Sequence, residues 1–336
     1  MPELILWARF SATGPPGPRT HAPGSCRYVG IVTDVLIPSL AEDLSFPEEL
    51  TIHVWDSGDP LPADDILSRI EYYVMPYTFA PDTGDIAAKL PRLKVMQTLT
   101  AGYEHAKPYL PDGVTLCNAR GVHDASTAEL AVTLTLASLR GIPTFVEARP
   151  RGEWTFGFYD ALADRTVLIV GYGSIGQAIE RRLAPFECDV LRVARTARDG
   201  VAGFASLPEL VGRSDVIILV CPLTEDTRGM VDAEFLAAMR DGALLVNVAR
   251  GPIVDTDALV AELSTGRIRA AVDVTDPEPP PAGHPLWTVP GLLMSPHVGG
   301  SSSAFRPRAR RLIQGQLQRY AAGEPLENVV AGPLAR

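Results

Sequence analysis

Cysteine is scarce in this sequence. The four cysteines, Cys26, Cys117, Cys188 and Cys221, form no C-x-x-C pair. This spacing excludes a disulfide-stabilised scaffold and a cysteine-based zinc site, so no metal is expected and a reduced, cytoplasmic setting is favoured. No apolar run approaches the ~20 residues that cross a bilayer, and the start of the chain carries no basic leader with a cleavage site. We therefore expect no membrane partner.

Positive charge is the second shortage. Lysine and arginine together number 30 against 40 acidic residues, which gives a net charge of −10. Only Lys89, Lys94 and Lys107 among the basic residues are lysines, and the rest are arginines. Because an acidic chain repels polyanions, nucleic acid is not expected as a partner. The abundance of arginine also means that one arginine in a loop carries little information by itself.

Strands and helices alternate along most of the chain. Its 336 residues suggest about two domains. Residues 1–27 are rich in proline and glycine and are predicted to be a flexible extension. Apolar, β-branched segments at residues 28–37 and 166–170 predict strands, and the last helix is expected over residues 301–320. The alternation predicts an α/β protein with parallel sheets.

A glycine-rich loop, G-Y-G-S-I-G at residues 171–176, follows an apolar strand and precedes an expected helix. In a G-x-G-x-x-G loop the first glycine permits a tight turn, the second lets a pyrophosphate approach, and the third lets the helix pack closely. This flanking pattern favours a dinucleotide site over a chance turn in a chain with 29 glycines. The predicted cofactor-binding residues are Gly171, Gly173, Ser174, Ile175 and Gly176.

The next strand bears on which dinucleotide binds. NAD sites usually place a carboxylate at the end of that strand to hold the ribose 2′-OH. Here the segment after residue 193 reads A-R-T-A-R and has no carboxylate. Arg195 and Thr196 suit a 2′-phosphate instead, through charge-assisted hydrogen bonds. The sequence favours NADP and leaves NAD open.

Three polar residues follow later strands, namely Arg250 in V-N-V-A-R-G, Glu278 in D-P-E-P and His297 in S-P-H-V-G-G. Ends of parallel strands converge, so these residues are expected to share a cleft. Hydride transfer to a ketone leaves charge on its oxygen, and a histidine oriented by a carboxylate is suited to protonate it. An arginine can bind a substrate carboxylate. Asp276 is the alternative to Glu278 as the partner of His297. Arg250, Glu278 and His297 could each instead have a purely structural role.

Several phrases taken together resemble the D-2-hydroxyacid dehydrogenase family, and they cover residues ~93–300. They include L-K-V-M-Q-T-L-T-A-G, T-A-E-L-A, C-P-L-T-E-D-T-R-G, V-N-V-A-R-G-P-I-V-D and S-P-H-V-G-G. The resemblance implies that Arg250 binds the substrate carboxylate and that His297 is the acid/base with Glu278 as its partner. Glu278, which directly precedes Pro279, is chosen over Asp276 as the partner of His297 because the family has an E-P phrase there.

The resemblance also implies two Rossmann-like lobes with a cleft between them. Residues 28–130 plus 305–336 would form the substrate-binding lobe, and residues 131–304 the dinucleotide-binding lobe. The backbone of Thr100, Ala101 and Gly102 would cradle the substrate carboxylate. Further cofactor contacts are expected from Thr127, Cys221, Val248 and Asp273. A homodimer is expected, with residues 149–159 as its arm.

The function expected from this resemblance is reduction of a small 2-keto acid to the D-2-hydroxy acid, as in glyoxylate and hydroxypyruvate reductases. Selectivity would depend on the pocket around Tyr77, Tyr103 and Trp287. The alternative is a dinucleotide-sensing binding protein or co-repressor on the same fold with little turnover.

Overall fold

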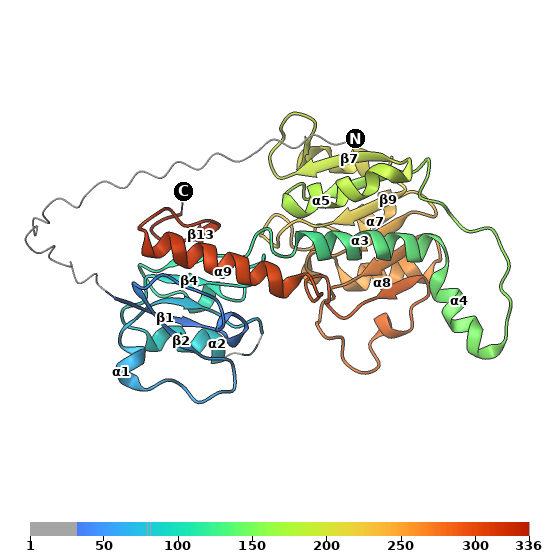
Figure 1. Cartoon of the computed structure of the whole chain (residues 1–336). Helices are drawn as coiled ribbons and strands as arrows, with labels where there is room; N and C mark the ends of the chain where they lie inside the picture. The colour runs from blue at the N-terminus through green and yellow to red at the C-terminus, as the bar shows by residue number, and fades with distance from the viewer. Residues whose placement is uncertain (1–31, 79, 81, 336) are drawn as a thin grey trace, which may run out of the picture. The chain divides into compact units, whose positions relative to one another are not determined.

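The structure, a computed structural model, describes residues 32–78, 80 and 82–335. The predicted extension at residues 1–27 lies outside these residues. Two sheets organise the part of the chain that is described, and the strands of each sheet alternate with helices in chain order (Figure 1).

The first sheet has the order β13-β5-β4-β3-β1-β2. Its strands are β1 Thr33–Ile37, β2 Leu50–Val54, β3 Ile70–Val74, β4 Val95–Gln97, β5 Thr115–Cys117 and β13 Val329–Ala331. All neighbours run parallel except β13, which pairs antiparallel with β5 at the edge. Strand β13 is a difference from the parallel sheet that the sequence predicts, because three residues near the C-terminus carry too little pattern to reveal a strand.

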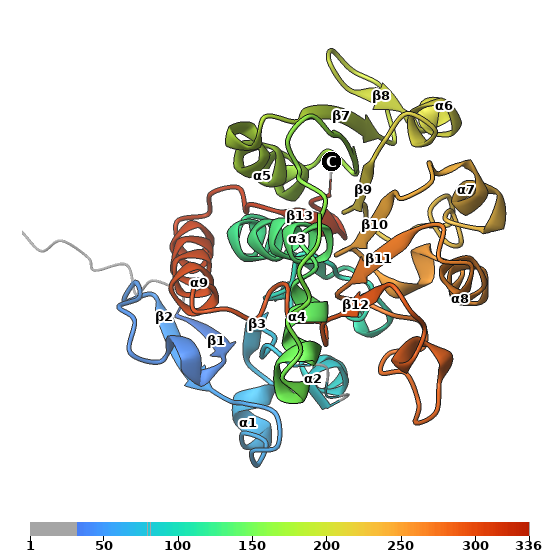
Figure 2. The same ribbon diagram turned by 90° about the vertical axis from the view of Figure 1, so that its right-hand side faces the viewer.

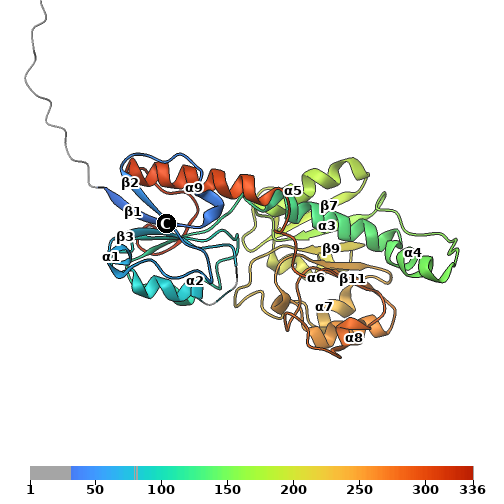
Figure 3. The ribbon, with the colours of Figure 1, turned by 60° about the horizontal axis from the view of Figure 1, so that its bottom comes forward.

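Helices cover both faces of the first sheet. Helix α9, Phe305–Ala321, lies on one face, and the short helices α1, Asp64–Leu67, and α2, Asp82–Asp85, lie toward the other (Figures 1 and 3). Successive strand residues serve opposite faces, as the strand period of two requires. Val35 and Ile37 pack with Ile313 of α9, whereas Leu36 packs on the opposite side.

The second sheet has the order β12-β11-β10-β9-β6-β7-β8, with every neighbouring pair parallel. Its strands are β6 Thr166–Val170, β7 Asp189–Ala194, β8 Ala202–Gly203, β9 Val216–Leu219, β10 Leu244–Asn247, β11 Arg269–Val272 and β12 Leu292–Met294. Strands β9 and β10 are fully buried, as is β6 after Thr166, and their residues are apolar except Thr166 and Asn247, which is typical of a parallel sheet covered on both faces.

Helices α3, Asp124–Leu139, and α5, Ser174–Leu183, cover one face of the second sheet (Figure 2). Helices α6, Leu207–Val211, α7, Ala233–Ala238, and α8, Thr256–Ser264, cover the other face. Asp232 and Asp255 cap α7 and α8 by accepting hydrogen bonds from Phe235 N and Ala258 N. The α/β fold class with two Rossmann-like sheets is confirmed.

Two local expectations need correction or remain open. The last helix begins at Phe305 rather than at residue 301, because Ser301 and Ser302 lie in a turn in which Ser301 N donates to the Val298 carbonyl. Helix α4, Ile142–Ala148, was not foreseen. The predicted lobe boundary near residue 130 falls inside α3 and stays a prediction.

Helix length and hydropathy also bear on membrane insertion. Within the described part of the chain, no single helix is long and apolar enough to cross a bilayer. Residues 124–139 and 142–151 satisfy the length and composition criteria only as a pair, and that pair is bent by 64°.

Candidate active site

His297 and Glu278 lie together at the carboxyl ends of β11 and β12. The His297 Nδ1 atom and the Glu278 Oε1 atom form a short hydrogen bond. Thr275 N donates to the other carboxylate oxygen at 3.3 Å, which helps to hold Glu278 in place. Burial raises the pKa of Glu278, but the hydrogen bond and charge of His297 outweigh it, so the pKa lies below its ordinary value. This carboxylate is ionised at neutral pH and is the partner expected for the histidine, whereas Asp276 has no such contact among the described residues.

A buried carboxylate fixes the loop that carries His297. Asp273 is 3% exposed. It accepts hydrogen bonds from Ser295 Oγ at 2.6 Å, Val298 N at 2.8 Å and Gly299 N at 2.8 Å. His297 N donates to the Asp273 carbonyl at 2.8 Å, and the His297 backbone has a φ of 52°, in the left-handed region that non-glycine residues rarely adopt. These bonds on both sides of His297 offset the backbone strain and orient the side chain.

Arg250 extends from the end of β10 to the loop after β4. Its guanidinium lies against Gly102, where a Cβ atom would fall 1.6 Å from Arg250 Nη2. Arg250 Nη1 donates to the Ala249 carbonyl at 2.7 Å, and Nη2 lies 3.6 Å from Glu104 Oε2. Residues from the two sheets therefore meet here, and a side chain at position 102 would displace the Arg250 guanidinium.

The carbonyls of residues 100–102 are already in use. The Thr100 carbonyl accepts from Ala119 N at 2.8 Å, the Ala101 carbonyl from Asn118 Nδ2 at 2.6 Å, and the Gly102 carbonyl from Thr100 Oγ1 at 2.6 Å. The amide groups of the same three residues have no acceptor in the described structure. An unpaired run of N–H groups beside an arginine is suited to bind a carboxylate.

These residues surround one cavity of about 370 Å³. The predicted residues that line it are Thr100, Ala101, Gly102, Thr127, Ile175, Val248, Arg250, Asp273, Glu278 and His297. Thr127 Oγ1 also donates to the Gly299 carbonyl at 3.2 Å, which ties α3 to the His297 loop. Of the three aromatic residues expected to shape selectivity, Tyr77 lines the cavity. Tyr103 packs instead in the core of the first sheet, and Trp287 is half exposed.

The sequence did not point to His105 and His123, which also line the cavity. His123 Nε2 bonds to the Leu99 carbonyl at 2.7 Å, and its Nδ1 has no hydrogen-bond partner in the described structure. Burial lowers the pKa of both histidines, so both are neutral at neutral pH. Neither histidine was assigned a role from the sequence, and the tertiary structure places both beside Arg250 and His297.

The glycine loop joins β6 to α5. Gly171 has a φ of 109°, and a Cβ there would fall 2.4 Å from Cys221 N. A Cβ on Gly176 would fall 2.4 Å from the Gly171 carbonyl oxygen, which explains the close packing of α5. A Cβ on Gly173 would meet nothing within 4 Å, so the absence of a side chain at this position leaves space above the loop. This cradle fits a dinucleotide pyrophosphate at the α5 N-terminus.

The remaining predicted cofactor residues extend from this loop, outside the cavity. Ser174 Oγ donates to Asp124 Oδ1 at 3.2 Å. Cys221 is buried beside Gly171, and burial raises the pKa of its thiol to about 11. Arg195 and Thr196 are exposed directly after β7. Arg198 donates to the Tyr172 carbonyl at 2.5 Å, which places a second arginine beside the glycine loop.

The side chains that commonly bind metal ions are not clustered in the described part of the chain. Among the residues that the structure describes, no group of three or more histidine, cysteine, aspartate or glutamate side chains could hold a metal ion.

Similarity to known proteins agrees with this geometry. Residues 132–299 match the family described as D-isomer specific 2-hydroxyacid dehydrogenase, NAD binding domain. A human protein named glyoxylate reductase/hydroxypyruvate reductase is 34% identical over 296 residues, which cover 82% of this chain and 89% of that protein. A glyoxylate reductase of Thermococcus onnurineus is 32% identical over 297 residues, 82% of this chain and 88% of its own length.

Two solved structures extend the likeness to three dimensions. An NADPH-dependent glyoxylate/hydroxypyruvate reductase from Sinorhizobium meliloti, in complex with NADP and sulfate, is 29% identical with a TM-score of 0.76. The match covers 89% of this chain and 98% of that one. A D-isomer specific 2-hydroxyacid dehydrogenase from Xanthobacter autotrophicus, in complex with NADPH and MES, is 30% identical with a TM-score of 0.74, covering 89% and 98%.

The fold and the site define an NAD(P)-dependent dehydrogenase that acts on small 2-hydroxy or 2-keto acids. The predicted enzyme class and nicotinamide dinucleotide cofactor are confirmed. The chain belongs to the D-isomer specific 2-hydroxyacid dehydrogenase family.

Proposed function

We propose that this enzyme reduces small 2-keto acids to D-2-hydroxy acids with NADPH, and that glyoxylate and hydroxypyruvate are substrates. The observation that carries the proposal is the contact of Arg250 with Gly102 beside the His297–Glu278 pair. This arrangement supplies a carboxylate-binding group and a proton donor within one cavity. The names of the human and Sinorhizobium meliloti relatives support the choice of substrates.

Each residue has a defined role in this proposal. Arg250 and the amides of residues 100–102 bind the substrate carboxylate, because they present unpaired donors. His297 protonates the oxygen of the ketone, and the ionised Glu278 keeps the imidazole oriented through the hydrogen bond to His297 Nδ1. Glu104, 3.6 Å from Arg250, must give way when the substrate carboxylate binds.

The dinucleotide supplies the hydride when it is bound. Gly171, Gly173, Ser174, Ile175 and Gly176 would hold its pyrophosphate, and Thr127, Cys221, Val248 and Asp273 would line its path. The exposed Arg195 and Thr196 would bind a 2′-phosphate, and residues 194–198 contain no carboxylate to oppose it. Arg195→Ala should cost about 1–3 kcal/mol of binding to NADPH and little to NADH.

The experiment is a panel of 2-keto acids (glyoxylate, hydroxypyruvate, pyruvate and phenylpyruvate) with NADPH and NADH, followed by oxidation of the dinucleotide. We expect turnover of glyoxylate with NADPH, and we expect His297→Ala to lower kcat by at least about a hundredfold. An unchanged kcat in His297→Ala would contradict the mechanism. A kcat/KM that favours NADH would contradict only the assignment of the 2′-phosphate site.

We further propose that the chain forms a homodimer in the cytoplasm. The segment after α4 exposes Trp154, Phe156 and Phe158, with 93%, 85% and 102% of each residue's surface accessible. Three large aromatic side chains so close together are unusual on a monomer and suit a protein interface. Light scattering should give a dimer mass for the natural chain and a monomer mass after all three are changed to serine. A monomer mass for the natural chain would refute the proposal.

A further inference from the structure

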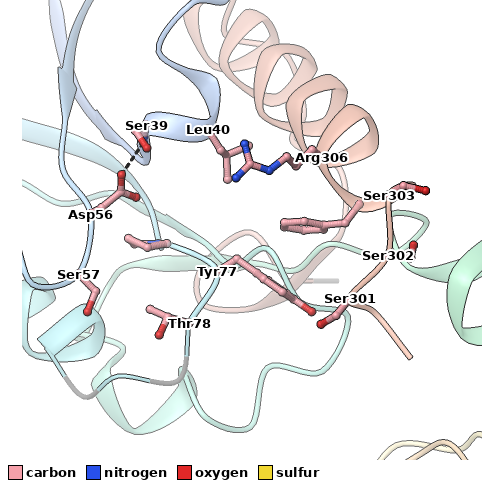
Figure 4. A pocket seen from close by; sticks show the side chains of 12 residues that line it. Ser39, Leu40, Asp56, Ser57, Tyr77, Thr78, Ser301, Ser302, Ser303 and Arg306 are labelled. Carbon is pink, nitrogen blue, oxygen red and sulfur yellow. Dashed lines mark hydrogen bonds between the residues drawn. The ribbon is translucent and has the colours of Figure 1, made fainter. Parts of the chain in front are cut away.

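A second cavity, of about 780 Å³, adjoins the candidate active site. Tyr77 and Ser301 line both cavities. The second cavity lies beyond the carboxyl ends of β1, β2 and β3 and beside the first turn of α9 (Figure 4). Ligands of open α/β sheets bind at this end of the strands, where the strand order reverses, as it does at β1 in this sheet.

Gly300 packs closely beside Tyr77, a residue that both cavities share. The rings of Tyr77, His123 and Phe305 pack together, with centroid distances of 4.2–5.6 Å. A Cβ on Gly300 would lie 2.8 Å from Tyr77 Oη and 2.7 Å from His123 Nδ1. The segment that carries His297 therefore passes this aromatic group only because position 300 has no side chain.

The second cavity has charged and hydroxylated walls. Arg306, the second residue of α9, reaches toward Leu40, and Asp56 enters from the end of β2 (Figure 4). Asp56 Oδ2 accepts a hydrogen bond from Ser39 N at 3.1 Å. The hydroxyls of residues 301–303 also line the cavity.

The charge of Arg306 is not compensated within the described structure. Arg310, one turn further along α9, forms an ion pair with Asp43 at 2.5 Å and donates to the Leu40 carbonyl. Arg306 has no carboxylate within ion-pair distance among the described residues. A guanidinium in a cavity wall is suited to bind a carboxylate, and Phe305 and Tyr77 offer apolar surface for a methylene chain.

We propose that the second cavity binds the distal carboxylate of a 2-keto dicarboxylic acid whose 2-keto acid end lies in the first cavity. The inference rests on the proposed function, since it needs Arg250 and His297 to act on the keto acid end. Arg306 and the serine hydroxyls hold the second carboxylate. Asp56 on the other wall opposes it and limits its affinity.

The test compares dicarboxylic 2-keto acids (oxaloacetate, 2-oxoglutarate and 2-oxoadipate) with monocarboxylic acids of matched chain length (2-oxobutanoate, 2-oxopentanoate and 2-oxohexanoate). Glyoxylate, which is too short to leave the first cavity, is the reference. The variants are Arg306→Ala, Asp56→Asn and the control Arg308→Ala. Arg308 lies on the same helix but lines a separate small cavity with Arg120 and Arg311.

We expect at least one dicarboxylate to be preferred over its monocarboxylic counterpart by kcat/KM. Arg306→Ala should raise the KM of that dicarboxylate about tenfold or more, with little change for glyoxylate. Asp56→Asn should lower the same KM, because a negative charge is removed from the opposite wall. Arg308→Ala should change neither value.

Two results would overturn the inference. One is reduction of glyoxylate with no preference for any dicarboxylate, and the other is an equal effect of Arg306→Ala and Arg308→Ala. If the natural enzyme does not reduce glyoxylate, the proposed function fails instead. Calorimetric binding of 2-oxoadipate to the natural chain and to Arg306→Ala then decides the inference, because loss of binding in the variant supports it and equal binding refutes it.

Discussion

Gly173→Ala should abolish tight dinucleotide binding without destabilising the fold. Gly173 is the N-cap of α5, with φ −91° and ψ −155°, an extended conformation that alanine adopts without strain. A Cβ there meets no protein atom within 4 Å. The only group that the added methyl would obstruct is one that approaches the loop from outside, which is where the pyrophosphate is proposed to lie.

The magnitudes follow from this geometry. Displacing the pyrophosphate would weaken one or two charge-assisted hydrogen bonds from the loop, each worth about 1.5–3 kcal/mol. A loss of about 3 kcal/mol corresponds to a Kd raised roughly a hundredfold. The free energy of unfolding should stay constant or rise by about 0.4–1 kcal/mol, because alanine restricts the unfolded chain.

Gly176→Ala is the matched comparison. Its Cβ would lie 2.4 Å from the Gly171 carbonyl oxygen, so backbone must move. We expect it to lower the free energy of unfolding by about 1–3 kcal/mol. The assays are calorimetric unfolding without ligand and fluorescence titration with NADPH and NADH. An unchanged Kd in Gly173→Ala, or a loss of stability equal to that of Gly176→Ala, would refute the reasoning.

Three further substitutions test the supports of the site. Asp273→Asn should lower the free energy of unfolding by about 2 kcal/mol and kcat by more than about tenfold. The reason is that the asparagine amide leaves a buried N–H group unpaired and loosens the loop that carries His297. An unchanged free energy of unfolding together with an unchanged kcat would count against this role. Glu278→Gln should have a lower Tm than the natural chain at pH values above 4.5, the ordinary pKa of a glutamate carboxyl. The difference in Tm should vanish as the pH falls through the lower pKa that Glu278 has in the folded chain. A difference in Tm that grows in acid would contradict the assignment. Gln316→Leu should lower the free energy of unfolding by about 2–3 kcal/mol, because Gln316 Nε2 donates to the buried Gln97 Oε1 at 2.9 Å. A urea unfolding curve that matches that of the natural chain would disprove this prediction.

Local pattern was enough to predict much of this fold. The strand at Thr166–Val170 agrees with the prediction residue for residue. Apolar runs and glycine turns are local signals, so they fix such elements without any knowledge of their neighbours. The short edge strand β13 escaped prediction because it forms only by pairing with β5, which lies far away in the chain.

The structure brings together the site residues that lie within strong phrases, and their roles stay predictions. Arg250, Glu278 and His297 each follow a recognisable strand, and the structure brings them to one cavity. No role was assigned to His123 from the sequence, and it enters the site through its contact with the Leu99 carbonyl. Trp287 was expected near the pocket, but it is half exposed and does not line the cavity.

The sequence by itself determined the two-sheet α/β architecture and the family, because these depend on period, glycine placement and short motifs. Only the tertiary structure decided that Asp273 fixes the His297 loop, that Glu104 faces Arg250, and that Tyr77 borders a second cavity. These features join residues that are distant in the chain. Their energies come from hydrogen bonds, burial and charge that exist only when the chain is folded.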